Sequence, residues 1–223
     1  MSGQVDIDPV VLQRFGTDPL TGVAVLTIEG DILYMNAGTT RLLFGEPTNP
    51  EDLIGKNLRE IGMPEEWVTE RLKLFEVLKE SKKAFLMRSV LHGMQHFSWV
   101  SPIEPESDEE IERVLITVRR CSTSQEAEYL RDGAYKFINS NFVQLGNLDT
   151  LTAREIEVLA LLGQGLSVKA IAKTLFRSAS TIENHRDSIG KKLAVSRGVE
   201  LALIAHNAGL VVEDARRIRL KDE

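Results

Sequence analysis

The sequence predicts an α+β N-terminal half followed by an all-α C-terminal segment. Three observations support this division: β-rich runs flank a glycine turn near the N-terminus, three further strand-like runs follow a helical stretch, and short amphipathic helices fill the last third. We expect a five-stranded antiparallel sheet with helices over residues 17–121, a linker helix over 122–147 and a four-helix domain over 148–212.

The first half alternates strand and helix patterns. Residues 22–28 are β-rich and precede the turn Glu29-Gly30-Asp31, where glycine tolerates a positive φ, and residues 32–36 complete a hairpin. Helical spacing of apolar residues follows at 36–44 and 64–80. Three strands are expected at 84–92, 95–103 and 111–120, with the acidic segment 104–110 as a solvated turn.

The predicted linker helix contains no proline between residues 122 and 145. Its seam repeats every three or four residues and consists of Ala127, Leu130, Ala134, Phe137 and Asn141. Two interpretations stay open: a solvated helix that packs on its own sheet, or a helix that pairs two subunits. Asn141 would set the register in the second case.

Helix-capping signals order the last third. Thr152 and Glu155 form a capping-box pattern, Gly163 and Gly165 end the first helix, and Ser167 and Ser178 precede the next two. In the helix after Ser178, Ile182, Ile189 and Leu193 form one inward stripe, and the other sides are polar. Such a helix suits the DNA major groove, which requires one apolar side for anchoring and one polar side for contacts. We expect Arg154 and Glu155 to tie helices together and His185 to be a half-buried structural residue.

The net charge of −6 is unevenly distributed. Residues 1–147 contain 15 Lys and Arg against 23 Asp and Glu, whereas residues 148–223 contain 12 against 10. Within residues 151–197 the balance is 8 against 4. The basic charge therefore coincides with the predicted groove-binding helices, as phosphate contact requires.

Several protein classes are disfavoured. The N-terminus lacks the pattern of a signal peptide, and no run of about 18 apolar residues predicts a membrane span. The single cysteine, Cys121, excludes an internal disulfide and fits a reducing cytoplasm. One cysteine and four histidines do not suggest a metal site. No catalytic constellation is found, so we expect a cytoplasmic protein that is not an enzyme, with no catalytic residues.

Residues of about 17–120 resemble a PAS domain. The resemblance rests on GVAVLTIEGDILYMNAGTTRLLFG at 22–45, DLIGKNLREI at 52–61 and RVLITVRR at 113–120. It implies a sensor that binds a cofactor or metabolite, or that only dimerises; the cofactor is left unknown. Flavin photochemistry is disfavoured because Cys121 lies after the last strand. Haem is disfavoured because His92 and His96 lie near a strand turn, where we expect them to be exposed.

Residues 151–210 are similar to the LuxR-type (GerE-like) helix-turn-helix. The matching motifs are LTAREIEVLALLGQGLSVKAIAKTL, STIENH, the Lys-Lys-Leu triplet at 191–193 and SRGVEL at 196–201. The resemblance implies base contacts from Glu183, Asn184 and Asp187. It implies phosphate contacts from Thr181, Lys169, Arg177, Arg186, Lys191 and Lys192. Glu183 and Asp187 depart from the family, which often has basic residues at these positions. An acidic side chain can accept a hydrogen bond from N4 of cytosine, and an asparagine can pair with adenine.

The same resemblance implies that a fourth helix over 197–207 dimerises through Val199, Leu203 and Leu201. We therefore expect a homodimeric regulator of transcription that binds double-stranded DNA, with RNA polymerase as a further candidate partner and no membrane. The alternative is that the N-terminal half binds a partner protein and no small molecule. A receptor for acyl-homoserine lactones is disfavoured because its ligand domain is larger and has an aromatic motif that is absent here. The operator, the direction of regulation and the element that forms the dimer interface stay open.

Overall fold

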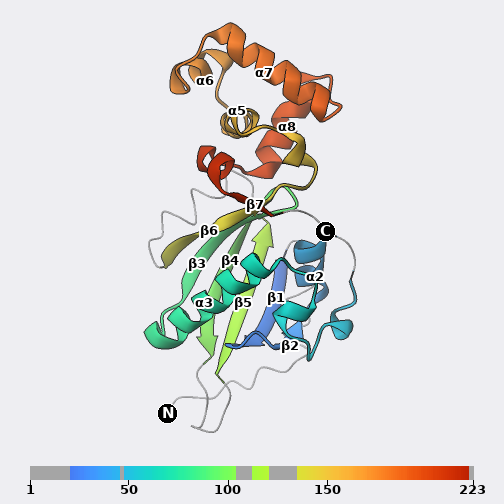
Figure 1. Cartoon of the computed structure of the whole chain (residues 1–223), viewed down its shortest axis with the longest axis vertical. Helices are drawn as coiled ribbons and strands as arrows, with labels where there is room; N and C mark the ends of the chain where they lie inside the picture. The colour runs from blue at the N-terminus through green and yellow to red at the C-terminus, as the bar shows by residue number, and fades with distance from the viewer. Residues whose placement is uncertain (1–20, 46–47, 104–111, 121–134, 221–223) are drawn as a thin grey trace. The chain divides into compact units, whose positions relative to one another are not determined.

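The computed structural model describes residues 21–45, 48–103, 112–120 and 135–220 (Figure 1). Its residues form two compact units, one comprising Met1–Leu86 with Ser98–Arg119 and the other Met87–Phe97 with Arg120–Glu223. The predicted acidic turn at 104–110 and the part of the predicted linker at 122–134 lie outside the described residues. No helix in the described ranges is long and apolar enough to cross a membrane.

The first unit contains the predicted hairpin. β1 (Thr21–Thr27) pairs antiparallel with β2 (Ile32–Met35), and a register shift lies between Val25 and Leu26. Gly30 in the turn has a φ of 96°, a value that favours glycine, which confirms the predicted turn chemistry. On its other side β1 pairs antiparallel with β5 (Arg113–Arg120) over its whole length.

The helices of the first unit follow the predicted pattern. α2 (Ala37–Phe44) begins at Asn36, whose side-chain oxygen accepts from the backbone N–H of Thr39. The short 3-10 helices η1 (Pro50–Asp52) and η2 (Leu58–Glu60) lead into α3 (Glu65–Ser81). α3 buries Trp67, Phe75 and Leu78 along one side, because apolar residues spaced by about one helical turn share a face.

The sheet has more strands than the sequence predicts. β3 (Phe85–Leu91) and β4 (Met94–Ile103) complete the expected five, but the strand order is β2-β1-β5-β4-β3-β6-β7. The prediction of a five-stranded sheet is therefore wrong in strand count. The additional strands are β6 (Lys136–Gln144) and β7 (Ile218–Leu220), which pair in parallel.

The prediction of a linker helix over residues 122–147 is wrong for residues 136–144, which form the extended strand β6. Phe137, Ile138, Phe142 and Val143 are aromatic or β-branched residues, which favour a strand when a partner strand is available. The neighbours of β6 in the sheet are β3, which ends about 45 residues earlier, and β7, which begins more than 70 residues later, so a local reading of spacing could not detect either. Phe137 and Asn141, assigned to a helical seam, lie on this strand.

The second unit contains the four predicted helices. They are α5 (Ala153–Gly163), α6 (Val168–Thr174), α7 (Ala179–Lys192) and α8 (Gly198–Ala208), with the 3-10 helices η3 (Gly146–Thr150) and η4 (Val212–Arg216) before and after them. One apolar cluster joins these helices to the neighbouring strands, since Val90 of β3 and Val143 of β6 belong to the same cluster as Ile156 and Leu159.

A buried ion pair links β3 to the chain after α8. Arg88 donates to both carboxylate oxygens of Asp214 at 2.9 and 2.8 Å and to the carbonyl of Gly209 at 3.0 Å. The two charged side chains are 1% and 0% exposed. Because a charge this deeply buried needs a partner, Arg88 depends on Asp214, which also pairs with Arg217 at 3.0 Å.

Candidate nucleic-acid interface

Serine and threonine caps fix where each helix of the interface begins. Thr152 and Glu155 exchange hydrogen bonds between side chain and backbone at the start of α5, which confirms the predicted capping box. Ser167 and Ser178 accept from backbone N–H groups in the first turns of α6 and α7, as predicted. These bonds satisfy donors that a helix start leaves unpaired.

The turn between α6 and α7 is tight and exposed. Phe176 adopts a φ of 53°, and its side chain is 88% exposed. The N–H of Arg177 bonds to the carbonyl of Ala172 at 2.9 Å, which closes the turn. The turn therefore sets the direction in which α7 leaves α6.

α7 is anchored on one side and free on the other. Ile182 and Ile189 are fully buried, and Leu193 packs partly against the same core. The predicted base-contacting residues and one predicted phosphate contact are all exposed: Glu183, Asn184, Asp187 and Lys191. They lie within three or four residues of one another along the helix and share one face, which we call the reading face.

The other predicted phosphate contacts lie around this face. Lys169 on α6 and Arg177 in the turn are exposed. Thr181 is half-buried and hydrogen-bonded to Ser178 through its hydroxyl at 2.8 Å. Arg186 is half-buried on the side of α7 toward the start of α8, where it lines a hollow with Gly198.

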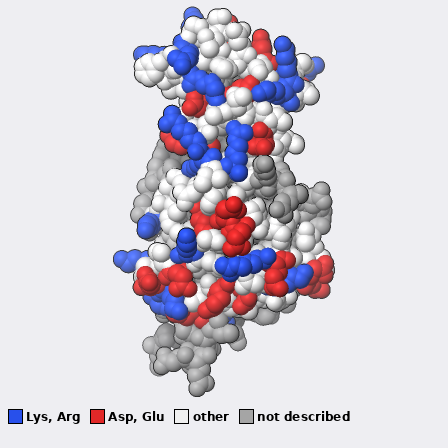
Figure 2. Space-filling view, in the orientation of Figure 1, with Lys and Arg blue, Asp and Glu red and all other residues white. Residues whose placement is uncertain are grey.

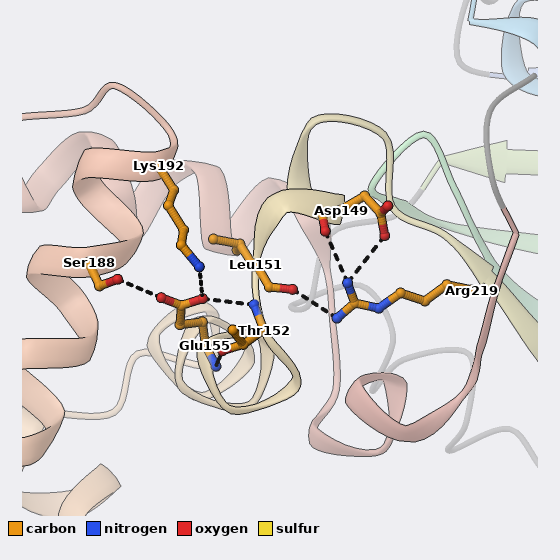
Figure 3. Close-up of polar contacts among 7 residues, drawn as sticks. All are labelled: Asp149, Leu151, Thr152, Glu155, Ser188, Lys192 and Arg219. Carbon is orange, nitrogen blue, oxygen red and sulfur yellow. Dashed lines mark hydrogen bonds and ion pairs between the residues drawn. The ribbon is translucent and has the colours of Figure 1, made fainter.

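Lys192 has an intramolecular partner. Its Nζ donates to Oε2 of Glu155 at 2.6 Å, and Ser188 donates to Oε1 at 2.6 Å (Figure 3). Burial raises the pKa of the Glu155 carboxyl, but hydrogen bonds from Lys192, Ser188 and Thr152 outweigh this effect and lower the pKa to about 2. Glu155 is thus ionised and joins α5 to α7, in agreement with the prediction that it ties helices together. The sequence did not predict its partners on α7, Ser188 and Lys192.

A second polar connection, which sequence reasoning missed, holds the start of α5. Arg219 of β7 donates to the carbonyl and carboxylate of Asp149 at 3.0 and 3.2 Å and to the carbonyl of Leu151 at 2.9 Å (Figure 3). The partners are about 70 residues apart in sequence, and no local pattern marks the pair.

The histidines weighed as haem ligands occupy different settings. His92 lies in the turn between β3 and β4 with a φ of 50° and is half-buried. His96 is only 3% exposed, so the expectation that it is exposed near the turn is wrong. Burial, reinforced by the charge of Arg120, lowers the pKa of His96 to about 4, so it is neutral at pH 7.

On the face drawn in Figure 2, Lys and Arg side chains lie at both edges of the region of α6, α7 and α8, with Asp and Glu side chains among them. This agrees with the positive charge balance of residues 151–197. Within the ranges that the structure describes, no group of three or more His, Cys, Asp or Glu side chains could hold a metal ion.

The same segment matches a known family. Residues 149–205 match the model of the bacterial regulatory proteins of the luxR family. The transcriptional regulatory protein MctR of Rhizobium johnstonii is 27% identical over 69% of this chain and 72% of its own length. LnrK of Bacillus subtilis is 40% identical over 38% of each chain, and UhpA of Escherichia coli is 47% identical over 26% of this chain and 29% of its own. The chain thus spans well under half the length of the last two relatives.

Solved structures with detectable similarity include sensors and regulators. A complex of Vibrio cholerae VqmA with ligand and DNA is 17% identical, covers 92% of this chain and 91% of its own, and has a TM-score of 0.48. The PAS domain of the histidine kinase ThkA is 23% identical over 44% of this chain and 97% of its own, with a TM-score of 0.35. The match to the luxR family model is confined to residues 149–205, about a quarter of the chain.

Proposed function

We propose that the chain is a transcription regulator that binds double-stranded DNA sequence-specifically as a homodimer, its output gated by a PAS-like N-terminal domain. The observation that carries the proposal is the reading face of α7, held by two fully buried isoleucines in a segment that matches the luxR family model. An exposed polar helix face on a rigid apolar anchor suits insertion into the major groove.

We infer a distinct role for each residue of the reading face. Asn184 suits a bidentate contact with adenine, and Glu183 and Asp187 suit the N4 amino group of cytosine. Lys191 is exposed one helical turn after Asp187, and we assign it to a contact with the DNA backbone. Lys169, Arg177, Thr181 and Arg186 contact phosphates and position the helix without reading bases.

Lys192 takes a different role in this proposal. Its ammonium group lies 2.6 Å from the buried carboxylate of Glu155, and a phosphate contact would compete with that bond. We therefore assign Lys192 to positioning α7 relative to α5.

The homodimer compensates for two acids on the reading face. Glu183 and Asp187 weaken binding near phosphates, so two copies of α7 on adjacent half-sites raise affinity and specificity. Of the three α8 residues predicted to dimerise, Val199 and Leu203 are 81% and 58% exposed and fit an interface. Leu201 is 4% exposed and packs in the core of its own subunit, so its assignment to the interface is wrong.

Selection from a pool of random duplexes tests the proposal. The full-length chain should enrich a two-fold symmetric motif with half-sites about one DNA turn apart. Asn184→Ala should change the enriched sequence, whereas Lys191→Ala should weaken binding to all sequences and reduce the salt dependence by about one contact. An unchanged motif with Asn184→Ala would remove the base-reading role, and failure of the wild type to enrich any motif would remove the function.

The gating of the output has two candidate forms, a small-molecule ligand or a partner protein. An absorption spectrum and a native mass of the purified full-length chain separate them, because a bound ligand adds colour or mass. A native mass equal to that of the polypeptide alone, together with capture of a stable protein partner, would favour gating by a partner protein. RNA polymerase is a further candidate partner, which a co-purification with the enriched DNA motif would test.

A further inference from the structure

A basic hollow lies between the C-terminal half of α7 and the start of α8. It has a volume of about 430 Å³ and is lined on its charged side by Arg186, Lys191, Arg197 and Asp187. Three cations thus face one acid. Because like charges repel, such a cluster is favourable only when anions or water offset it.

Arg186 is the best-defined cation of this hollow. Its Nε is buried and has no hydrogen-bond partner among the residues that the structure describes. One of its terminal nitrogens lies 3.0 Å from the place that a Cβ on residue 198 would occupy, so glycine at this position gives the guanidinium its room. The guanidinium of Arg186 therefore lies beside Gly198, and no carboxylate among the described residues pairs with it.

Arg197 forms the outer edge of the hollow. Its side chain is 81% exposed, and its Nε lies 4.0 Å from Oε1 of Glu200, at the limit of an ion pair. Arg197 also precedes the first turn of α8 without capping it by its side chain. The backbone N–H groups in the first turn of α8 carry a partial positive charge, which adds to the charge of the arginines.

The hollow is continuous with the reading face of α7, because Asp187 and Lys191 belong to both. We propose that it receives a backbone phosphate of the bound DNA, held between Arg186, Arg197 and the start of α8. This inference rests on the proposed function. A phosphate of DNA fits better than a free phosphate because the two outer cations are exposed, whereas a site for a small free anion encloses its ligand.

The site makes Arg197 a phosphate contact that sequence reasoning did not include. It also explains Gly198 as a residue that makes room for a DNA-binding arginine. Each occupied hollow should add about 0.9 to the slope of log K against log salt concentration. Between about 50 and 200 mM salt this corresponds to a roughly threefold change in affinity per subunit.

Arg197→Gln tests the site, with Arg216→Gln as the matched control. Arg216 is 83% exposed on η4 and loses the same charge. Binding of the full-length chain to a labelled random-sequence duplex is measured by fluorescence anisotropy across this salt range. We expect the salt slope to fall by about 0.9 per subunit with Arg197→Gln and to keep the wild-type value with Arg216→Gln. Equal slopes for the two variants would overturn the site.

Gly198→Ala provides a second variant that changes no charge. The added methyl group displaces the flexible end of Arg186, so duplex binding should weaken about two- to threefold while urea unfolding is unchanged. Unchanged binding would remove Arg186 from the site. If the wild type binds neither random nor enriched duplexes, the proposed function itself fails; if it binds and only the variants behave as wild type, this site alone fails.

Calorimetry with sodium phosphate and no DNA separates the two sources of phosphate. We expect no saturable binding at millimolar concentrations. Saturable binding that Arg197→Gln abolishes would overturn the assignment to DNA and identify a site for free phosphate.

Discussion

Lys191 and Lys192 are adjacent residues for which the structure predicts opposite behaviour. Both lysines reach the surface, but Lys191 belongs to the reading face, whereas Lys192, with a side chain 33% exposed, is bonded to a Glu155 carboxylate that is 5% exposed. Replacing either by Met removes one charge and keeps the length of the side chain. Lys192→Met should therefore reduce stability, and Lys191→Met should reduce DNA binding.

The expected magnitude for Lys192→Met follows from the partners that Glu155 retains. Removing one member of a fully buried ion pair costs about 3–5 kcal/mol. Here the lysine is partly exposed, and Glu155 keeps its bonds from Ser188 and Thr152, so we expect about 1–2 kcal/mol. In a chain of this length, such a loss lowers the melting temperature by about 2–8 °C.

Urea unfolding followed by circular dichroism measures the stability term, and anisotropy with a random duplex measures the salt slope. Lys191→Met should keep the wild-type midpoint and lose about 0.9 from the slope per subunit. Lys192→Met should keep the slope, and its effect should be non-additive with Glu155→Gln because the two residues are in contact. If Lys192→Met leaves the midpoint unchanged and lowers the slope as Lys191→Met does, then Lys192 contacts DNA and the argument fails.

Three further changes probe the fold beneath the interface. Asp214→Asn should lower the free energy of unfolding by about 3–5 kcal/mol in urea titrations, because the Arg88 guanidinium would keep its charge without a carboxylate. Replacing Arg88 by Met as well should recover part of this loss. Full additivity of the two losses would contradict the pairing. Because the folded-state pKa of His96 is about 4 against about 6.5 when unfolded, stability should fall as the pH drops from 6.5 to 4, by about 3 kcal/mol; His96→Phe should flatten this dependence in urea titrations at a series of pH values, and an unchanged slope would exclude His96 as its source. Gly163→Ala would place a Cβ 2.5 Å from the carbonyl of Ala205 and should cost about 1–3 kcal/mol by separating α5 from α8; an unchanged melting temperature would show that this contact relaxes freely.

Local signals predicted most of the elements. The hairpin over β1 and β2 follows from β-rich runs around a glycine turn, and α5 to α7 follow from capping residues and apolar spacing. These features depend on residues fewer than about ten positions apart, which a single sequence displays directly. The predicted contacts of α7 fall on one exposed face for the same reason, since helical spacing alone decides which residues share a face.

Distant pairings account for what the sequence did not predict. β6 resembles a helix in its three- and four-residue spacing, and its pairing with β7 involves residues about 75 positions apart, such as Phe142 and Ile218. Arg88 and Asp214 are 126 residues apart, and neither belongs to a motif. The partner of a buried charged residue can be identified only in the folded structure, because in the sequence each of the two resembles an ordinary surface residue. The same limit applies to Lys192: helical spacing makes it a neighbour of the reading face, but only the position of α5 shows that its charge is directed at Glu155.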